Sequence, residues 1–415
     1  MNELTTLVEA EIGRRRDDAQ LSPAAHVTIT RSVTSASIVT GVRVALVAES
    51  FHPTVNGVSN SVQQAAGHLR RTGHQPLVVA PGPGPDVHDG VPVVRVRSFR
   101  LPLDRGVPVG CPKDGLTEIL DGFRPDVVHL ASPTVLGWYG AHAAQELGVP
   151  TVAVFQTDLA GFARRHHLGA FAPALWAWQR RLHALAAVTL VPSTWAAWQL
   201  SASGFDRLAL WRRGVDQQAF SPWHRSAALR HDLAPRGELI VGYVGRLARE
   251  KQVQQLKVLT GVPGIRLVVV GDGPSRARLG RALPGAIFLG FQRGRALSEA
   301  VASLDVFVHT GVDETFCQSI QEALASGVPV LAPARGGPLD LVRHDDNGWL
   351  WPAGEPTVLR EQVRALTEDR TRLATMRLRA RASVLGRTWQ SVGDELIGHY
   401  ADVIRGRDVV LQPAA

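Results

Sequence analysis

The chain has 415 residues, of which 45% are hydrophobic and 20% are charged, and this composition excludes wholesale disorder and collagen-like or low-complexity chains. Its length predicts two to three domains of about 150 residues each. The 45 Lys and Arg residues outnumber the 37 Asp and Glu residues, a balance that admits nucleic acid, an anionic membrane surface or a phosphorylated ligand without choosing among them.

Residues 1–40 show no strand rhythm, and we predict that they form an N-terminal extension. They lack the central apolar run of a secretory signal, and the apolar stretches further along are far shorter than the ~20 residues that a membrane span needs. The two cysteines, Cys111 and Cys317, indicate a reducing compartment. We therefore expect a cytoplasmic protein without a transmembrane segment, and we leave open peripheral contact with the inner membrane face.

An alternation of buried strands and amphipathic helices begins at residue 42. The run Val42–Ala48 is predicted to be a strand, and Val58–Thr72 has apolar residues at helical spacing. Further strands are predicted at Leu77–Ala80, Val91–Val96, Val127–Leu130, Thr151–Phe155 and Val188–Val191. Such alternation is typical of a parallel sheet that helices cover on both faces, and it predicts a Rossmann-like domain over residues 41–220.

The same alternation restarts after the stretch from Arg213 to Arg236. Strands are predicted at Leu239–Val244, Leu267–Val270, Ala286–Leu289, Val306–His309 and Val328–Ala332. They indicate a second Rossmann-like domain over residues 221–389, after which a helix at about residues 390–407 is free to pack back on the first domain. We expect an α/β fold of two doubly wound domains that face each other across a cleft.

Two glutamates eight residues apart, Glu314 and Glu322, lie around a strand-to-helix transition. If the helix begins near Phe316, its free N–H groups and positive dipole end can meet an anionic ligand. Glu314 could then accept hydrogen bonds from sugar hydroxyls, and Glu322 could bind a ribose diol. The alternative is that both glutamates merely cap and decorate a surface helix, but the continuation into a glycine-capped helix end and a buried strand at residues 323–330 favours the functional interpretation.

A second motif places two cations after a predicted strand. The strand ends in a turn at Gly245 that exposes Arg246, and Lys251 follows five residues later. Ligands of open α/β sheets bind at the carboxyl ends of the strands, so these cations could hold a diphosphate. The alternative is a pair of solvated surface cations. It is weaker for Lys251, because the chain contains only three lysines and a compact point charge suits a specific site.

Weaker signals follow three other predicted strands. A G-D-G-P turn begins at Gly271 and is ordinary turn chemistry if taken alone. Gly57, at a predicted helix start, would let the backbone approach a phosphate, although an ordinary turn explains it equally well. His129 and Asp158 are candidate polar groups near strand ends, and the alternative for His129 is a buried histidine with its hydrogen bonds satisfied.

Other site classes find no support in the sequence. No phosphate-binding loop of the G-x-x-x-x-G-K-[ST] type is present, and neither cysteine pairs nor histidine spacing indicates zinc. We expect no metal and no tightly bound cofactor. The cations are dispersed along the chain and do not alternate with aromatic residues, so we expect no nucleic-acid partner.

Taken together, these segments resemble a known family. G-Y-V-G-R-L-A-R-E-K at residues 242–251, G-D-G-P at 271–274, E-T-F-C-Q-S-I-Q-E at 314–322 and the N-G-V loop at 56–58 are similar to those of retaining nucleotide-sugar glycosyltransferases of family four, which have the GT-B fold. The likeness covers about residues 42–405. H-L-A-S-P at 129–133 and Q-T-D-L-A-G-F-A at 156–163 further resemble actinobacterial GDP-mannose-dependent α-mannosyltransferases.

The resemblance implies a role for each matching residue. The catalytic set would be Asp158, His129, Arg246, Lys251 and Glu314. The set that binds the donor would be Gly57, Gly245, Arg246, Lys251, Gly271, Glu314, Phe316, Cys317, Gln318 and Glu322. Two positions depart from the family pattern, because Ala131 replaces a second histidine and Asp158 stands where a histidine is expected.

The implied reaction transfers a hexosyl group, mannose or a related sugar, from a GDP-sugar with retention and without a metal. The acceptor would be a glycolipid or a small polar hydroxyl or thiol compound. Two alternatives share the fold, namely a nucleotide-sugar epimerase or hydrolase, and a binding protein without catalysis.

Overall fold

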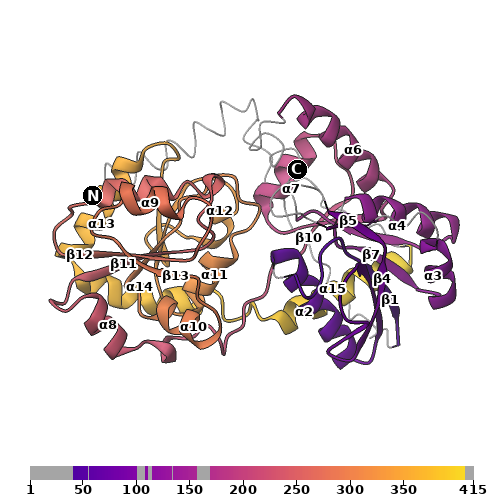
Figure 1. Cartoon of the computed structure of the whole chain (residues 1–415), viewed down its shortest axis with the longest axis horizontal. Coiled ribbons are helices and arrows are strands. Elements are labelled where there is room, and N and C mark those ends of the chain that lie inside the picture. Colours follow the sequence, from indigo (N-terminus) through magenta and orange to yellow (C-terminus); the bar gives the residue numbers. More distant parts are fainter. Residues whose placement is uncertain are drawn as a thin grey trace. The chain divides into compact units, whose positions relative to one another are not determined.

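The computed structural model describes residues 41–54, 56–100, 108–110, 115–132, 134–156 and 169–406. They form two compact α/β units, one of residues 214–388 and the other of residues 41–213 together with 389–406 (Figure 1). The predicted extension over residues 1–40 and the candidate Asp158 lie outside the described residues. The two units confirm the predicted α/β class and its two doubly wound sheets.

The N-terminal unit is built on an eight-stranded sheet in the order β10-β9-β8-β7-β1-β2-β4-β3. Its parallel strands are β1 (Arg43–Val47), β2 (Gln75–Pro81), β4 (Val91–Val96), β7 (Val127–Leu130), β8 (Thr151–Val154), β9 (Val188–Val191) and β10 (Leu208–Leu210). The short β3 (Val87–His88) runs antiparallel to β4 at the edge. Each of the central strands β1, β7, β8 and β9 is apolar at all positions but one, because helices bury both faces of the sheet.

The helices of this unit are α2 (Gly57–Arg71), α3 (Leu116–Phe123), α4 (Val135–Glu146), α6 (Ala172–Ala184), α7 (Thr194–Ala202) and α15 (Trp389–Ile404), with a 3-10 turn η1 (Gly169–Phe171). A separate ribbon joins β5 (Ser98–Arg100) to β6 (Pro108–Gly110). The buried Glu49, just after β1, accepts hydrogen bonds from the Gly110 and Leu136 N–H groups and the Thr134 hydroxyl. One carboxylate therefore ties the ribbon to the start of α4.

The last helix, α15, returns to the N-terminal unit and packs against α2 (Figure 1). His68 Nε2 of α2 lies 2.8 Å from Asp394 Oδ1 of α15. The helices come this close because residue 393 is glycine, since a Cβ there would lie 2.4 Å from the His68 ring. Trp211 Nε1 donates to the Val392 carbonyl at 3.0 Å. The two chain segments of this unit therefore share one hydrophobic core.

The C-terminal unit contains a six-stranded parallel sheet in the order β13-β12-β11-β14-β15-β16. The strands are β11 (Leu239–Val244), β12 (Ile265–Val270), β13 (Ile287–Gly290), β14 (Val306–Val308), β15 (Val330–Pro333) and β16 (Gly348–Trp351). The strand order reverses between β11 and β14. In doubly wound sheets, ligands bind outside the carboxyl ends of the strands at such a reversal.

Helices cover both faces of this second sheet. They are α8 (Ala227–Leu233), α9 (Arg276–Ala282), α10 (Gly294–Ala302), α11 (Gln318–Ala325), α12 (Pro338–Leu341), α13 (Pro356–Glu368) and α14 (Arg370–Ala382), with 3-10 turns η2 (Pro222–His224), η3 (Arg249–Lys251) and η4 (Val253–Leu259). Two apolar clusters result, one on each face. Within the described part of the chain, no helix is both long enough and apolar enough to span a bilayer.

One buried hydrogen bond couples α15 to the first sheet and can be tested. Tyr400 Oη lies 2.7 Å from His129 Nδ1, and both side chains are buried. Tyr400→Phe would leave Nδ1 without its partner, and a buried unsatisfied group costs about 1–3 kcal/mol. We expect a loss of that size in the free energy of unfolding, measured by urea titration. Tyr139→Phe, on the exposed face of α4, is the control, and equal midpoints for all three proteins would contradict the prediction.

Candidate active site

Two glycine turns shape the carboxyl edge of the second sheet. Gly271 has φ +130°, and a Cβ there would lie 2.0 Å from the Gly245 carbonyl oxygen. The loops after β11 and β12 are also joined by hydrogen bonds from the Leu247 N–H to the Asp272 carbonyl and from the Ser275 N–H to the Leu247 carbonyl, both 2.9 Å. Only glycine allows this approach, and the turn fixes the backbone that presents Arg246.

An ion pair joins the two predicted motifs of this unit. Lys251 Nζ lies 2.5 Å from Glu314 Oε1, and both side chains are half-buried. Burial by itself lowers the pKa of Lys251, but the charge and hydrogen bond of Glu314 outweigh it and raise that pKa above its usual value. The Thr310 hydroxyl donates to the Lys251 carbonyl at 2.6 Å. The loops that follow β11 and β14 therefore meet at the point where the strand order reverses.

Arg246 lies on the same loop as Lys251 and is more exposed. Its Nη1 atom is 3.8 Å from Glu250 Oε1, and 48% of its side chain is exposed. An ion pair of this length on a half-exposed side chain holds the guanidinium weakly. Its place on this loop puts Arg246 at the carboxyl edge of the sheet.

A pair of glycines after β15 holds the Glu314 segment in place. The Gly337 N–H donates to the Glu314 carbonyl at 2.7 Å, and a Cβ on Gly337 would lie 2.3 Å from the Phe316 carbonyl oxygen. This packing keeps residues 314–316 out of the helix. The helix α11 begins at Gln318, with Cys317 as its N-cap, two residues beyond the Phe316 near which the sequence suggested a start.

The start of α11 carries the remaining candidates of this unit. Gln318 Nε2 donates to the Gly214 carbonyl at 2.9 Å. Glu322, one turn further along, is half-buried, and burial raises its pKa to about 8. Among the described residues, no group donates a hydrogen bond to the Glu322 carboxylate. At pH 7 its folded form therefore mostly holds the proton, and it can both donate and accept hydrogen bonds.

The N-terminal unit holds Gly57 and His129. Gly57 opens α2, where the Asn56 side chain accepts from the Ser59 N–H, and a Cβ on it would meet nothing within 4 Å. His129 is buried, and burial together with the Arg213 charge lowers its pKa to about 3. It is therefore neutral and bonded to Tyr400 inside the core. Arg213 itself donates to Ser61 Oγ at 2.8 Å and to Gln156 Oε1.

The structure brings nine of the predicted residues together in the C-terminal unit, namely Gly245, Arg246, Lys251, Gly271, Glu314, Phe316, Cys317, Gln318 and Glu322. Sequence reasoning missed His309 and the pair Gly336–Gly337, which contact the same segment. The glycine pair a few residues after the predicted strand was a usable signal, because two adjacent glycines often mark a close backbone approach. Among the described residues, no group of three or more His, Cys, Asp or Glu side chains could hold a metal ion.

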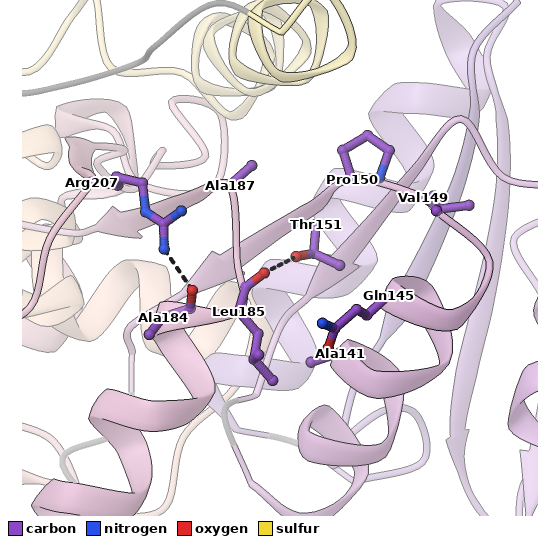
Figure 2. A pocket seen from close by; sticks show the side chains of 10 residues that line it. Ala141, Gln145, Val149, Pro150, Thr151, Ala184, Leu185, Ala187 and Arg207 are labelled. Atoms are coloured by element: carbon purple, nitrogen blue, oxygen red, sulfur yellow. Dashed lines mark hydrogen bonds between the residues drawn. The ribbon is translucent and has the colours of Figure 1, made fainter.

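A cavity of about 440 Å³ lies in the N-terminal unit, by the amino ends of β8 and β9 (Figure 2). Arg207 Nη2 donates to the Ala184 carbonyl at 2.6 Å, and Thr151 Oγ1 lies 3.4 Å from the Leu185 carbonyl oxygen. None of the candidate residues lines this cavity, so it is distinct from the carboxyl edge.

Comparison with known proteins identifies the family. Residues 55–219 match the family model described as Glycosyltransferase Family 4, and residues 227–383 match Glycosyl transferases group 1. A GDP-mannose-dependent alpha-mannosyltransferase of Mycobacterium tuberculosis is 54% identical over 88% of this chain and 98% of that protein. One of the same name from Mycolicibacterium smegmatis is 51% identical over 88% of this chain and 99% of its own.

The fold has solved relatives as well. HepE of Anabaena, in complex with UDP-glucose, superposes with a TM-score of 0.69 at 20% identity, over 86% of this chain and 98% of HepE. The family matches over most of the chain and the two Rossmann-like units lead to the same assignment. This chain is a hexosyltransferase that belongs to glycosyltransferase family 4 and has the GT-B fold.

Proposed function

We propose that the protein transfers a mannosyl group from GDP-mannose to an acceptor, with retention at the anomeric carbon and without a metal ion. The donor is supported by the names of relatives that are 51% and 54% identical over nearly their whole length. The observation that carries the proposal is the Lys251–Glu314 pair at the strand-order reversal of the C-terminal unit. This pair places a cation beside a carboxylate that can accept hydrogen bonds from sugar hydroxyls.

Each candidate residue has a chemical task in this proposal. Arg246 and Lys251 hold the diphosphate, and the Gly245 and Gly271 turns leave room for it. Glu314 accepts hydrogen bonds from sugar hydroxyls. The free N–H groups at the start of α11, together with the backbone of Phe316, Cys317 and Gln318, meet the sugar and the β-phosphate. Glu322 binds the ribose diol, and Gly57 lets the backbone come close to a phosphate.

The chemistry asks for charge stabilisation more than for a protein nucleophile. As the bond from the anomeric carbon to the diphosphate breaks, negative charge grows on the departing GDP, and Arg246 and Lys251 stabilise it. The acceptor hydroxyl or thiol forms its bond to the anomeric carbon on the face that the diphosphate leaves, which retains the configuration, and a diphosphate oxygen takes the acceptor proton. His129 is neutral and buried, so its proposed contribution is to hold the sheet edge in place, while Asp158 contacts the sugar or the acceptor.

The acceptor is either a glycolipid or a small polar hydroxyl or thiol compound. A cytoplasmic enzyme in peripheral contact with the inner membrane face would suit the first. A screen by mass spectrometry of GDP-mannose, GDP-glucose, UDP-glucose and ADP-glucose against both acceptor classes separates them. Donor consumption without any acceptor would instead support a hydrolase or epimerase, and donor binding without turnover would support a non-catalytic binder.

Removing either cation should abolish most donor turnover. We expect Arg246→Ala and Lys251→Ala each to lower kcat by at least 100-fold, because loss of a group that stabilises transition-state charge costs about 10²–10³ in rate. Lys257→Ala, an exposed lysine on η4, is the matched control and should keep wild-type rates. Turnover in EDTA should equal that without it. Wild-type turnover in both variants would refute the proposed diphosphate site.

The raised pKa of Glu322 makes a separate prediction about stability. The folded carboxyl keeps its proton up to a pKa of about 8, whereas the unfolded one loses it near 4.3, so the folded state binds more protons between these values. Wild-type stability should therefore fall as pH rises from 4.5 to 8. Glu322→Gln mimics the protonated form and should unfold at the same temperature as wild type near pH 4.5, and at a higher temperature above pH 8.

Thermal unfolding of both proteins from pH 4.5 to 9 measures this difference. If the difference in melting temperature between the two proteins stays constant across this pH range, the pKa of Glu322 is not raised in the folded state. The same variant should raise the KM for GDP-mannose, because an amide cannot ionise to a carboxylate, whose two oxygens accept from both hydroxyls of the ribose diol.

A further inference from the structure

Cys317 has a backbone conformation that side chains rarely adopt. Its φ is +91° and its ψ is +71°, whereas the other described non-glycine residues with positive φ lie between +48° and +63°. A residue held in such a region costs of order 1–3 kcal/mol, and glycine would remove most of that cost. The thiol side chain is therefore present despite a backbone that favours glycine.

The thiol contacts a histidine that no motif predicted. Cys317 Sγ lies 3.6 Å from His309 Nε2, and the two residues are 7% and 3% exposed. His309 directly follows β14, and its N–H donates to the Leu331 carbonyl of β15 at 2.8 Å. The imidazole is thus attached to the centre of the sheet, while Cys317 belongs to the start of α11.

The same imidazole nitrogen faces the ion pair of the active site. His309 Nε2 is 3.9 Å from Glu314 Oε1, the oxygen that Lys251 Nζ contacts at 2.5 Å. Gly311 makes room where these groups meet, because a Cβ there would lie 2.8 Å from Glu314 Oε1 and 3.1 Å from His309 Nε2. Glu314 Oε1 is therefore confined between the lysine and the imidazole.

Both members of the Cys317–His309 contact are uncharged at neutral pH. Burial lowers the pKa of His309 to about 4, with Glu314 opposing and Lys251 adding to the shift. Burial raises the pKa of the Cys317 thiol well above its usual range. Glu314 raises it further, and Lys251 lowers it. The contact therefore acts through packing and hydrogen bonding and does not change the charge of the site.

A second unfavourable feature sits beside the strained backbone. His309 Nδ1 is buried and finds no hydrogen-bond partner among the described residues. An unsatisfied buried polar atom costs about 1–3 kcal/mol. An apolar residue at position 309 would avoid this cost, just as glycine at 317 would avoid the strain. Two neighbouring residues that each oppose stability mark a functional constraint.

We propose that His309 and Cys317 are positioning residues that hold Glu314 Oε1 and the start of α11 in one geometry, and thereby set which pattern of hydroxyls on the donor hexose is accepted. This rests on the proposed role of Glu314 as the group that contacts the sugar. Neither side chain needs to touch the donor, although the backbone of Cys317 meets it in the proposed site. Their effect reaches it through the carboxylate and the free N–H groups of α11.

The test compares two donors that differ at one hydroxyl, GDP-mannose and GDP-glucose. The ratio of their kcat/KM values should fall about tenfold in Cys317→Gly and in His309→Leu. Cys317→Ser and His309→Gln, which keep a polar atom near the original one, should retain a ratio within about threefold of wild type. Cys317→Gly should also melt at or above the wild-type temperature, because it removes backbone strain. A purely structural role would lower the rates with both donors equally and leave the ratio unchanged.

Arg124→Gly is the matched control, because Arg124 is exposed and also has a positive φ, +50°, in the other unit. It should leave the donor ratio as in wild type. An unchanged ratio in both Cys317→Gly and His309→Leu would overturn the inference, provided that Lys251→Ala still abolishes turnover. If Lys251→Ala also remains active, the proposed donor site itself fails, and the two failures are thereby distinguished.

Discussion

The ion pair between Lys251 and Glu314 is the contact on which the site of the C-terminal unit depends. It joins the loop after β11 to the loop after β14, with 2.5 Å between Lys251 Nζ and Glu314 Oε1. The strand order of the sheet reverses between these two strands. Each partner is also held from behind, Lys251 by Thr310 and Glu314 by Gly337. A half-buried, charge-assisted contact of this kind is stronger than an exposed one. The cation and the carboxylate are therefore in place before any donor arrives.

Glycine builds the rest of this edge by allowing backbone segments to touch. The β12 turn meets the β11 turn at Gly271, and the loop after β15 meets residues 314–316 at Gly337. These approaches fix residues 314–316 ahead of α11, and the first N–H groups of that helix have no partner within it. Burial at this edge also raises the pKa of Glu322 to about 8, and Cys317 has a strained backbone there.

Much of the fold was predictable because its signal is local. Buried runs such as Leu239–Val244 became strands at the predicted positions, and the strand–helix alternation fixed the α/β class that the comparisons confirm. The sequence suggested the start of α11 only to within two residues, and the packing of Gly336 and Gly337 on residues 314–316 involves segments far apart in the sequence. His309 was missed for a similar reason, since a single histidine after a strand carries no spacing signal until its neighbours are known.

By itself, the sequence determined where the strands lie, which loops carry Arg246, Lys251, Glu314 and Glu322, and to which family the chain is similar. These follow from hydrophobic runs and from motif spacing, which are properties of neighbouring residues. Only the tertiary structure decided which groups meet and in which protonation state. Lys251 is 63 residues from Glu314 and His129 is 271 residues from Tyr400, and burial makes Glu322, His129 and His309 neutral because desolvation penalises a charge that no local pattern reveals.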